Sequence, residues 1–303
     1  MHGLSILHVL NVNSFQKVDQ LIEFLTWAVR KGVNVRQRSR DGQTALHLMM
    51  QHLGEKRWAD RIFDFFSQTE LDIEARDRWG LKARDIFRGE KRGHQKRISA
   101  QALNDLDLKQ KDQDMLQIVN NLAQDPLLED SWGRNALGCL AYITRPMPDV
   151  PLLHQPAYAR LNLLFFCLGF DMDVNHYDMS GSTALHSFVF KPRLEEYKDE
   201  LTTAHFVRAL INAGADVRLR DRNGDTALHL ACKYGRINCV HALLHARSDL
   251  NAVNDGGRTV LAEARWWLEH GEDTDAAARV QMCMAEIHAR GGKDVLENQN
   301  QCY

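Results

Sequence analysis

The 303-residue sequence predicts an all-α solenoid of stacked helix–turn–helix units, with extended or hairpin finger loops between the units. Three observations lead to this fold class. The string Asp-x-x-Gly-x-Thr-Ala-Leu-His occurs at 178–186 and 221–229, and again at 39–47 with serine in the first place. Weaker copies continue in the same frame at 77–80, 130–137 and 254–261, and residues 3–8 match its second half. Apolar residues at helical spacing follow the copies. Such self-similarity is typical of repeat proteins, whose units bury their apolar faces by stacking.

Each copy of the string contains the signals for a tight turn followed by a helix. The glycine supplies a positive φ without steric cost, and an aspartate ahead of it can cap the turn. The threonine two positions later stands where a helix begins, with an oxygen for the unpaired N–H groups. A second helix is then indicated by stripes such as Val240, Leu243 and Leu244.

The spacing of the string glycines predicts insertions between helices. Successive glycines from Gly42 lie 38, 53, 48, 43 and 33 residues apart. The excess falls in the polar stretch 88–114, the proline-rich stretch 145–156 and residues 191–200. Long surface loops add little loop-closure entropy, so the stack can tolerate these insertions.

These residues resemble the ankyrin-repeat family, whose signature is an Asp-x-x-Gly turn followed by Thr-Pro/Ala-Leu-His. The resemblance implies one ankyrin-repeat domain over residues 1–291. Its expected units are 1–38, 39–76, 77–129, 130–177, 178–220, 221–253 and 254–291. The first unit lacks its turn, so we expect a truncated or weakly capped N-terminus. The last should form a C-terminal cap with a helix at 276–289, and residues 292–303 a flexible tail.

Composition argues against several classes of protein. A net charge of −2 and a pI near 6.7 do not fit a dedicated nucleic-acid binder. Six cysteines without Cys-x-x-Cys spacing indicate a reducing compartment. The longest apolar run, 161–170, is about half the roughly 20 residues that a membrane span needs. We therefore expect a cytoplasmic or nuclear protein without direct nucleic-acid or membrane contact.

Several histidines and acidic groups suggest a catalytic or metal site, but in each case a structural role is the better interpretation. His8, His47, His186 and His229 share one position of the string, where the resemblance implies hydrogen bonds to the string threonine and nearby backbone. Equivalent residues of neighbouring repeats lie about 10 Å apart, too far to share a metal. The cluster of Cys232, Cys239, His241 and His245 lacks zinc-ligand spacing.

The segment 171–175 begins like a calcium loop, but His176 stands where that loop needs glycine and Ser182 where it needs glutamate. The sequence contains no nucleophile-elbow, metalloprotease, P-loop or dinucleotide-binding string. We expect no enzyme, no cofactor and no metal. A metal or cofactor bound to the purified protein would revive the enzyme hypothesis.

The candidate partner-binding residues follow from the resemblance, which implies binding through fingertips and the first-helix surface. Arginine pairs recur at equivalent offsets, and three such pairs predict a positive groove suited to an acidic peptide or protein surface. Aromatic residues and methionine at the tips are types enriched in interfaces. The predicted residues are Arg38, Arg40, Arg76, Arg78, Trp79, Trp132, Tyr177, Met179, Arg220, Arg222, Lys233 and Tyr234. For Trp79 and Trp132, packing on the adjacent finger is an equal alternative.

Two functions are left as the main hypotheses. The first is a non-catalytic scaffold or adaptor that binds another protein. The alternative is an ankyrin-type transcription coregulator that acts in the nucleus without reading DNA. The basic run 88–97 would favour this alternative as a nuclear-import signal, or it could contact phosphate, although such a run is more often simply a solvated insertion.

Overall fold

The computed structural model describes residues 5–53, 57–88, 121, 128–130, 132–142, 156–170, 172–190, 200–270 and 274–294. Their regular structure is helical, apart from single antiparallel bridges at the finger loops, such as Arg220 with Thr226. The expected all-α solenoid is thereby confirmed. None of the helices described is long and apolar enough to cross a membrane.

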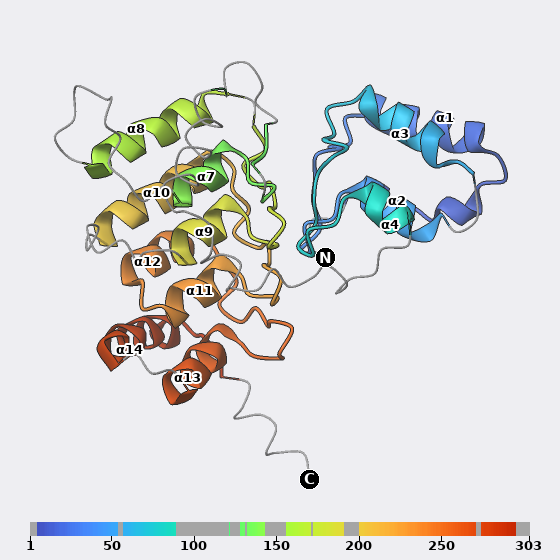
Figure 1. Ribbon diagram of the computed structural model, residues 1–303. Coiled ribbons are helices and arrows are strands. Elements are labelled where there is room, and N and C mark those ends of the chain that lie inside the picture. The colour runs from blue at the N-terminus through green and yellow to red at the C-terminus, as the bar shows by residue number, and fades with distance from the viewer. Residues whose placement is uncertain are drawn as a thin grey trace, which may run out of the picture.

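The helices fall into two groups along the chain (Figure 1). The described residues from 5 to 88 form the N-terminal array, and those from 128 to 294 form the C-terminal array. The N-terminal array contains the 3-10 helices η1 (Ile6–His8) and η2 (Val12–Ser14), then α1 (Val18–Arg30), α2 (Ala45–His52), α3 (Ala59–Ser67) and α4 (Ala83–Phe87).

The C-terminal array stacks four helix pairs in two layers. The first helices of the pairs are α7 (Ala136–Tyr142), α9 (Ala184–Phe190), α11 (Ala227–Lys233) and α13 (Val260–His270). The second helices are α8 (Pro156–Leu168), α10 (Glu200–Asn212), α12 (Ile237–His245) and α14 (Thr274–Ala289). Each first helix contacts the next, and so does each second helix, which is the arrangement of a repeat solenoid.

The recurring string forms the cap of each complete first helix. The Thr44 N–H donates to His47 Nδ1 over 3.2 Å, and the Thr44 Oγ lies 2.8 Å from the same nitrogen. His47 Nε2 lies 3.1 Å from the carbonyl of Leu81 in the next unit, so Nε2 carries the proton. Burial and the nearby charge of Arg38 lower the pKa of His47 to about 3, which keeps the ring neutral.

The same contacts recur at Thr183–His186 and Thr226–His229, with partner carbonyls in the next finger loop. Ser5 takes the place of threonine beside His8, with Oγ 2.8 Å from Nδ1. The hydrogen-bonding role expected of the string histidines is therefore confirmed. His47, His186 and His229 also link one unit to the next, because their two ring nitrogens contact successive units.

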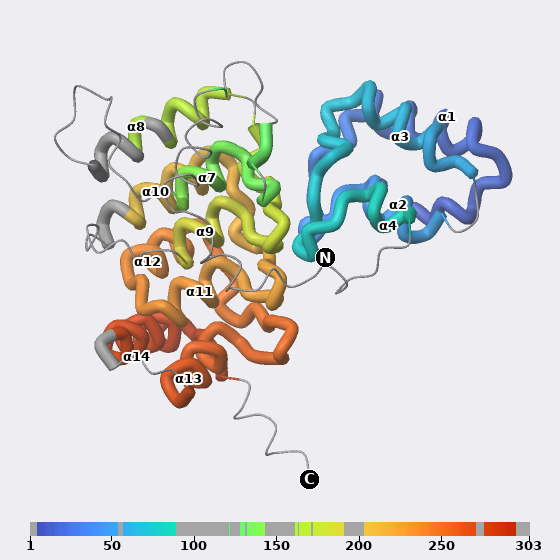
Figure 2. The backbone as a smooth tube through the Cα atoms, viewed as in Figure 1, coloured from blue at the N-terminus to red at the C-terminus, as the bar shows by residue number. Residues whose placement is uncertain are grey.

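Among the described residues, buried apolar side chains form two clusters. One runs from Leu7 to Ala83 in the N-terminal array, and the other from Ala136 to Ile287 in the C-terminal array. Helix α4 is only five residues long. Any second helix that would pair with it falls among residues outside the described ranges. Figure 2 shows the path of the chain through the two arrays, with their finger loops facing one another.

Several predicted features lie outside the described residues. These are most of the insertion 88–114 with the basic run 88–97, the stretch 145–155, residues 191–199 and the tail from 295 to 303. The division into seven units stays a prediction.

Candidate functional site

Six finger loops connect the units and lie between the two arrays. Fingers 1 and 2 are residues 31–44 and 68–82 of the N-terminal array. Fingers 3, 4, 5 and 6 are residues 128–135, 169–183, 213–226 and 246–259 of the C-terminal array, as far as they are described. They carry nearly all the residues predicted to bind a partner.

The turn at each fingertip is fixed by the string itself. In finger 2, Asp77 Oδ1 accepts hydrogen bonds from the N–H groups of Trp79 and Leu81 over 2.9 and 3.1 Å. In finger 5, Asp221 does the same for Asn223 and Asp225 over 2.8 and 2.9 Å. The string glycine then adopts a positive φ, between 69° and 79° at these tips. The local sequence thus builds one turn geometry repeatedly.

The fingers of the two arrays pack directly against one another. A Cβ placed on Gly42 of finger 1 would lie 2.2 Å from the ring of Tyr177 in finger 4. A Cβ on Gly181 of finger 4 would lie 2.0 Å from the carbonyl oxygen of Arg78 in finger 2. Only glycine allows backbones this close. The contact between the arrays therefore depends on glycine for space as well as for conformation.

Backbone hydrogen bonds also cross from one array to the other. The Arg220 N–H donates to the carbonyl of Arg40 over 3.2 Å. The Arg222 guanidinium donates to the carbonyls of Trp79 and Met179 over 3.1 and 2.6 Å. The fully buried Tyr177 donates its hydroxyl to the carbonyl of Arg220 over 2.8 Å. The contacts with Arg40 and Trp79 join finger 5 to fingers 1 and 2, and the other two join finger 5 to finger 4 within the C-terminal array.

Three arginines of the N-terminal array meet carboxylates of the C-terminal array. Arg38 forms an ion pair with Asp173. Arg76 lies 3.0 Å from Glu129, and Arg78 lies 3.1 Å from Asp255 and 3.1 Å from Asp41 of its own array. The three arginine side chains are only 6–8% exposed.

The expected exposed positive groove is therefore absent from the described structure. Arg76, Arg78 and Tyr177 are buried, and the Arg38 side chain is only 6% exposed. The acidic groups that we expected on a partner are supplied by the same chain. Whether these residues contact a partner in another state stays a prediction. Arg40 is exposed, whereas the remaining predicted residues are partly buried: Trp79, Trp132, Met179, Arg220, Arg222, Lys233 and Tyr234.

Contacts within the chain explain part of why tryptophan occurs at the same offset in fingers 2 and 3. The Arg78 guanidinium lies over the Trp79 ring, 4.5 Å from its centroid. The carbonyl of Trp132 accepts a hydrogen bond from the Met179 N–H over 2.8 Å, which joins finger 3 to finger 4. Both tryptophans keep part of their surface exposed.

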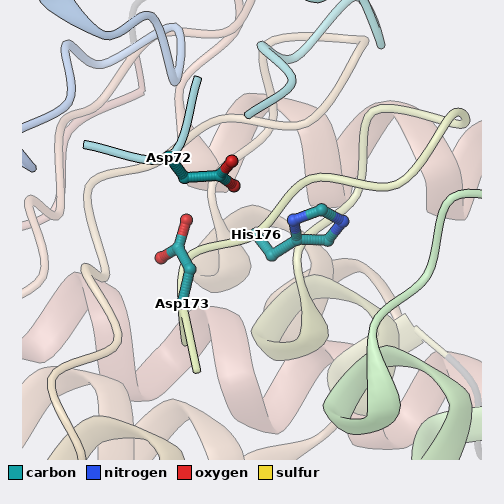
Figure 3. Close-up of side chains that lie close together, drawn as sticks. All are labelled: Asp72, Asp173 and His176. Atoms are coloured by element: carbon teal, nitrogen blue, oxygen red, sulfur yellow. The ribbon is translucent and has the colours of Figure 1, made fainter. Parts of the chain in front are cut away.

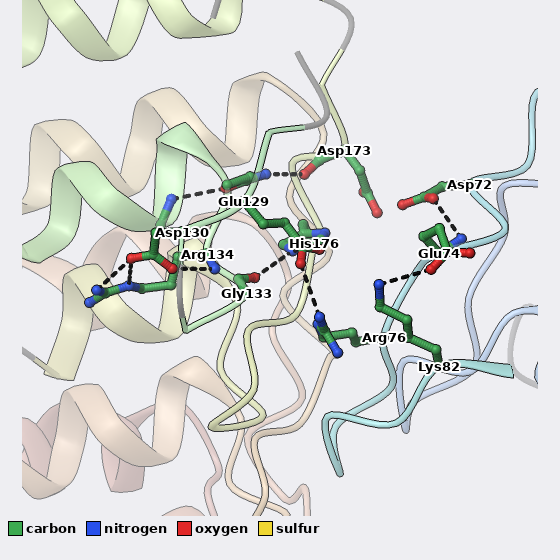
Figure 4. Close-up of polar contacts among 12 residues, drawn as sticks. Asp72, Glu74, Arg76, Lys82, Glu129, Asp130, Gly133, Arg134, Asp173 and His176 are labelled. Atoms are coloured by element: carbon green, nitrogen blue, oxygen red, sulfur yellow. Dashed lines mark hydrogen bonds and ion pairs between the residues drawn. The ribbon is translucent and has the colours of Figure 1, made fainter. Parts of the chain in front are cut away.

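His176 is the titratable centre of the contact between the arrays (Figure 4). Its Nε2 lies 2.8 Å from the carbonyl of Gly133 and 3.2 Å from Glu129 Oε1. Burial alone would lower the pKa of His176, but the hydrogen bond and charge of Glu129 and the charge of Asp173 raise it above the usual value. Burial alone would raise the pKa of Glu129, yet His176 and Arg76 lower it to about 2.

The edge of the His176 ring also lies near two carboxylates (Figure 3). Asp72 of finger 2, Asp173 and His176 each offer one possible ligand atom, and these atoms lie within 4.8 Å of one another. Such a set could hold a divalent cation. Arg38 already pairs with Asp173, however, and the raised pKa of His176 favours a proton at this place. We interpret the group as a polar contact between the arrays.

A cavity of about 1100 Å³ lies beside this group, between the bases of the fingers. Arg36 and Asp72 line it from the N-terminal array, and Asn175, Asp216, Arg218 and Arg247 line it from the C-terminal array. The contact between the arrays is therefore incompletely filled.

A second buried network joins fingers 5 and 6 to α13. Glu263 accepts from Lys233 over 2.7 Å and from Arg258 over 2.6 Å, and Asn254 donates to Asp225 over 2.7 Å. Burial alone would raise the pKa of Glu263, but Lys233 and Arg258 lower it to about 2. Lys233, predicted to bind a partner, thus has an acidic partner within the chain.

An aromatic row follows the ends of the first helices. It consists of Phe190, Tyr234 and Trp267, whose ring centroids are 5.4 Å apart between the first two and 6.4 Å apart between the last two. Phe190 is 45% exposed. Of these, the sequence analysis identified only Tyr234. The other two stand five or six positions after the string leucine, as Tyr234 does, so the repeat frame could have found them.

The two cysteines of the cluster considered as a zinc site belong to the apolar core. Cys232 and Cys239 are buried in the C-terminal cluster. Burial raises the pKa of the Cys232 thiol well above its usual range. His241 lies 3.5 Å from Glu286.

Comparison with known proteins agrees with this geometry. The family model for ankyrin repeats matches in three copies at residues 110–254 and 198–272, together more than half of the chain. The chain belongs to the ankyrin-repeat family. The match begins at residue 110, yet α2 in the N-terminal array has the same Thr–His cap as α11.

The chain is similar to parts of several curated proteins. It is 35% identical to human B-cell lymphoma 3 protein over 134 residues, which is 40% of this chain and 27% of that protein. It is 41% identical to human ankyrin repeat domain-containing protein 63 over 61 residues, 20% of this chain and 16% of that protein. It is 36% identical to mouse protein phosphatase 1 regulatory subunit 27 over 78 residues, 26% of this chain and 44% of that protein. Each match spans less than half of the relative's length.

Proposed function

We propose that the protein is a non-catalytic scaffold or adaptor that binds another protein along the first-helix surface of the C-terminal array. The observation that carries this proposal is the aromatic row of Phe190, Tyr234 and Trp267. Ankyrin repeats as a family serve protein–protein interaction and regulation, and one relative is named a regulatory subunit. The row lies on the side of the units where family resemblance implies binding.

The chemistry of the aromatic row suits a protein partner. Large aromatic rings bury much area at little conformational cost and dominate the energy of many interfaces. Phe190 ends α9, and Tyr234 follows α11, so the row crosses unit boundaries. A partner would therefore lie along the array and contact several units at once. Trp266, 41% exposed with Arg258 4.8 Å from its ring centroid, would extend the surface.

Site-specific photocrosslinking tests this proposal. A benzophenone amino acid is placed at Phe190 in one chain and at Phe166 in a control chain, and both are expressed in the native cell. Phe166 is 51% exposed on α8 in the second-helix layer, so it matches Phe190 in type and exposure but not in surface. We expect a discrete protein adduct at Phe190 and none at Phe166. Equal adducts at both positions, or an adduct at Phe166 alone, would remove the aromatic row from consideration.

We do not propose an acidic partner for Arg38, Arg76 and Arg78, because their charges are paired within the chain. Exposed Arg40 remains a candidate for an acidic partner. We keep the expectation of a cytoplasmic or nuclear protein that makes no direct contact with nucleic acid.

The alternative function is a nuclear transcription coregulator that does not read DNA. The basic run 88–97, with five basic residues in ten, favours it. A fluorescently tagged chain in which these lysines and arginines are replaced by alanine should leave the nucleus if the run is an import signal. Unchanged distribution would leave the run as a solvated insertion.

A further inference from the structure

We propose that the fingers of the C-terminal array form a docking surface for an arginine-bearing turn, and that the N-terminal array is its built-in occupant. We call this surface the acidic finger face and define it by Glu129, Asp173 and Asp255. A partner with a turn of the same chemistry would bind there by displacing the N-terminal array. This surface is separate from the aromatic row, and the inference does not depend on the proposed function.

Charge complementarity identifies the occupant's side chains. Each carboxylate of the acidic finger face pairs with one arginine of fingers 1 and 2: Asp173 with Arg38, Glu129 with Arg76, and Asp255 with Arg78. Arg78 presents two guanidinium nitrogens to one oxygen of Asp255, at 3.1 and 3.2 Å. A planar guanidinium suits such contacts better than an ammonium group. The surface therefore prefers arginine to lysine.

The backbone of the occupant is recognised as well. The glycine of finger 1 lies under the Tyr177 ring, and the carbonyl of Arg78 approaches Gly181 so closely that a Cβ there would be 2.0 Å away. Fingers 1 and 2 share the sequence Arg-x-Arg-x-Gly, at 38–42 and 76–80. The ligand chemistry is thus a tight turn with two arginines followed by glycine.

The physical character of the contact makes it reversible. Each array has its own apolar core. The contact between them includes three arginine–carboxylate ion pairs, hydrogen bonds to backbone carbonyls and close-packed glycines. Burying ion pairs yields little net stability, because desolvation offsets the attraction. The 1100 Å³ cavity at the finger bases leaves further area unpacked. Polar contacts between domains generally permit relative motion.

A peptide-binding experiment tests the docking surface. The probe is a fluorescein-labelled synthetic peptide with the sequence of residues 72–82, and its control peptide has alanine in place of both arginines. The full chain is compared with the full-length Arg38→Ala/Arg76→Ala/Arg78→Ala variant. Because a closed state reduces apparent affinity by the fraction that is open, we expect the variant to bind the probe at least about tenfold more tightly. Equal binding by both chains, or equal binding of the two peptides, overturns the proposal.

A cysteine pair keeps the test decisive if the triple variant unfolds. The backbones at Arg40 and Arg220 are joined by a 3.2 Å hydrogen bond, close enough for a disulfide between Arg40→Cys and Arg220→Cys. Oxidation should give an intramolecular disulfide and abolish probe binding, and reduction should restore it. Chains with either single cysteine serve as controls. Failure to form the bond within one chain, or unchanged probe binding after it forms, overturns the proposal.

Discussion

Replacing Gly181 by alanine tests the close approach of the finger loops. At this position φ is 78°, and a Cβ would lie 2.0 Å from the carbonyl oxygen of Arg78 in the other array. The left-handed backbone alone costs a residue with a Cβ about 1–2 kcal/mol. Overlap with a backbone atom that cannot rotate away adds a further cost of about 1–3 kcal/mol, typical of overpacked sites. The fingers can avoid this overlap only by separating.

Gly257 provides a matched control for this prediction. It is the string glycine of finger 6, with φ 73°, and a Cβ there would meet nothing within 4 Å. Gly257→Ala should therefore show the conformational cost alone. The assay is hydrogen exchange at the Arg220 amide, which donates to the Arg40 carbonyl of the other array. Faster exchange is expected in Gly181→Ala but not in Gly257→Ala, and equal rates in the two variants would refute the reasoning.

Three further predictions concern the core, pH and the second network. Leu228→Ala, at a fully buried position, should lower the free energy of unfolding by about 2–5 kcal/mol, and an unchanged urea midpoint would contradict the repeat frame. The folded pKa of His176 is raised, so its stabilising effect is fully present below about pH 6.5 and is lost as pH rises through the folded value. Exchange at the Arg220 amide, corrected for its intrinsic pH dependence, should show weaker contact at pH 8 than at pH 6, and His176→Gln should remove this difference. A difference that survives the substitution would exclude His176 as its cause. Glu263→Ala leaves Lys233 and Arg258 without their buried partner and should cost about 3–5 kcal/mol, whereas a loss below 1 kcal/mol in urea unfolding would show the network to be unimportant.

The sequence predicts the local parts of this fold well because each is determined by a few neighbouring residues. The Thr–His cap spans four positions, and the fingertip turn spans the five positions from Asp77 to Leu81. Both depend on hydrogen bonds between near neighbours, so a short string specifies them completely.

The pairing of the arrays could not be predicted in this way. Arg38 and Asp173 are 135 residues apart in the chain, and Arg78 and Asp255 are 177 apart. A repeat frame predicts contacts between neighbouring units, but it does not say that two fingers will fold back onto distant ones. From the sequence we therefore inferred that the arginines pair with acidic groups, and we placed those groups on another molecule.

The aromatic row is an intermediate case. Its members occupy nearly equivalent positions after the string leucine, so the information was present in the sequence. Aromatic residues at helix ends are equally compatible with a core position, and only exposure distinguishes the two. Phe190 is 45% exposed, whereas Tyr177, another aromatic residue at a tip, is fully buried.

A double-mutant cycle on Arg38 and Asp173 tests most directly whether arginine–carboxylate contacts hold the arrays together. Native-state hydrogen exchange at the Arg220 amide gives the free energy of opening for the unmodified chain, Arg38→Ala, Asp173→Asn and the double variant. For a partly buried pair in direct contact, we expect a coupling energy of about 0.5–3 kcal/mol, with the double variant losing less than the sum of the single ones. Strictly additive losses would mean that the two side chains do not interact and would contradict the closed arrangement of the arrays.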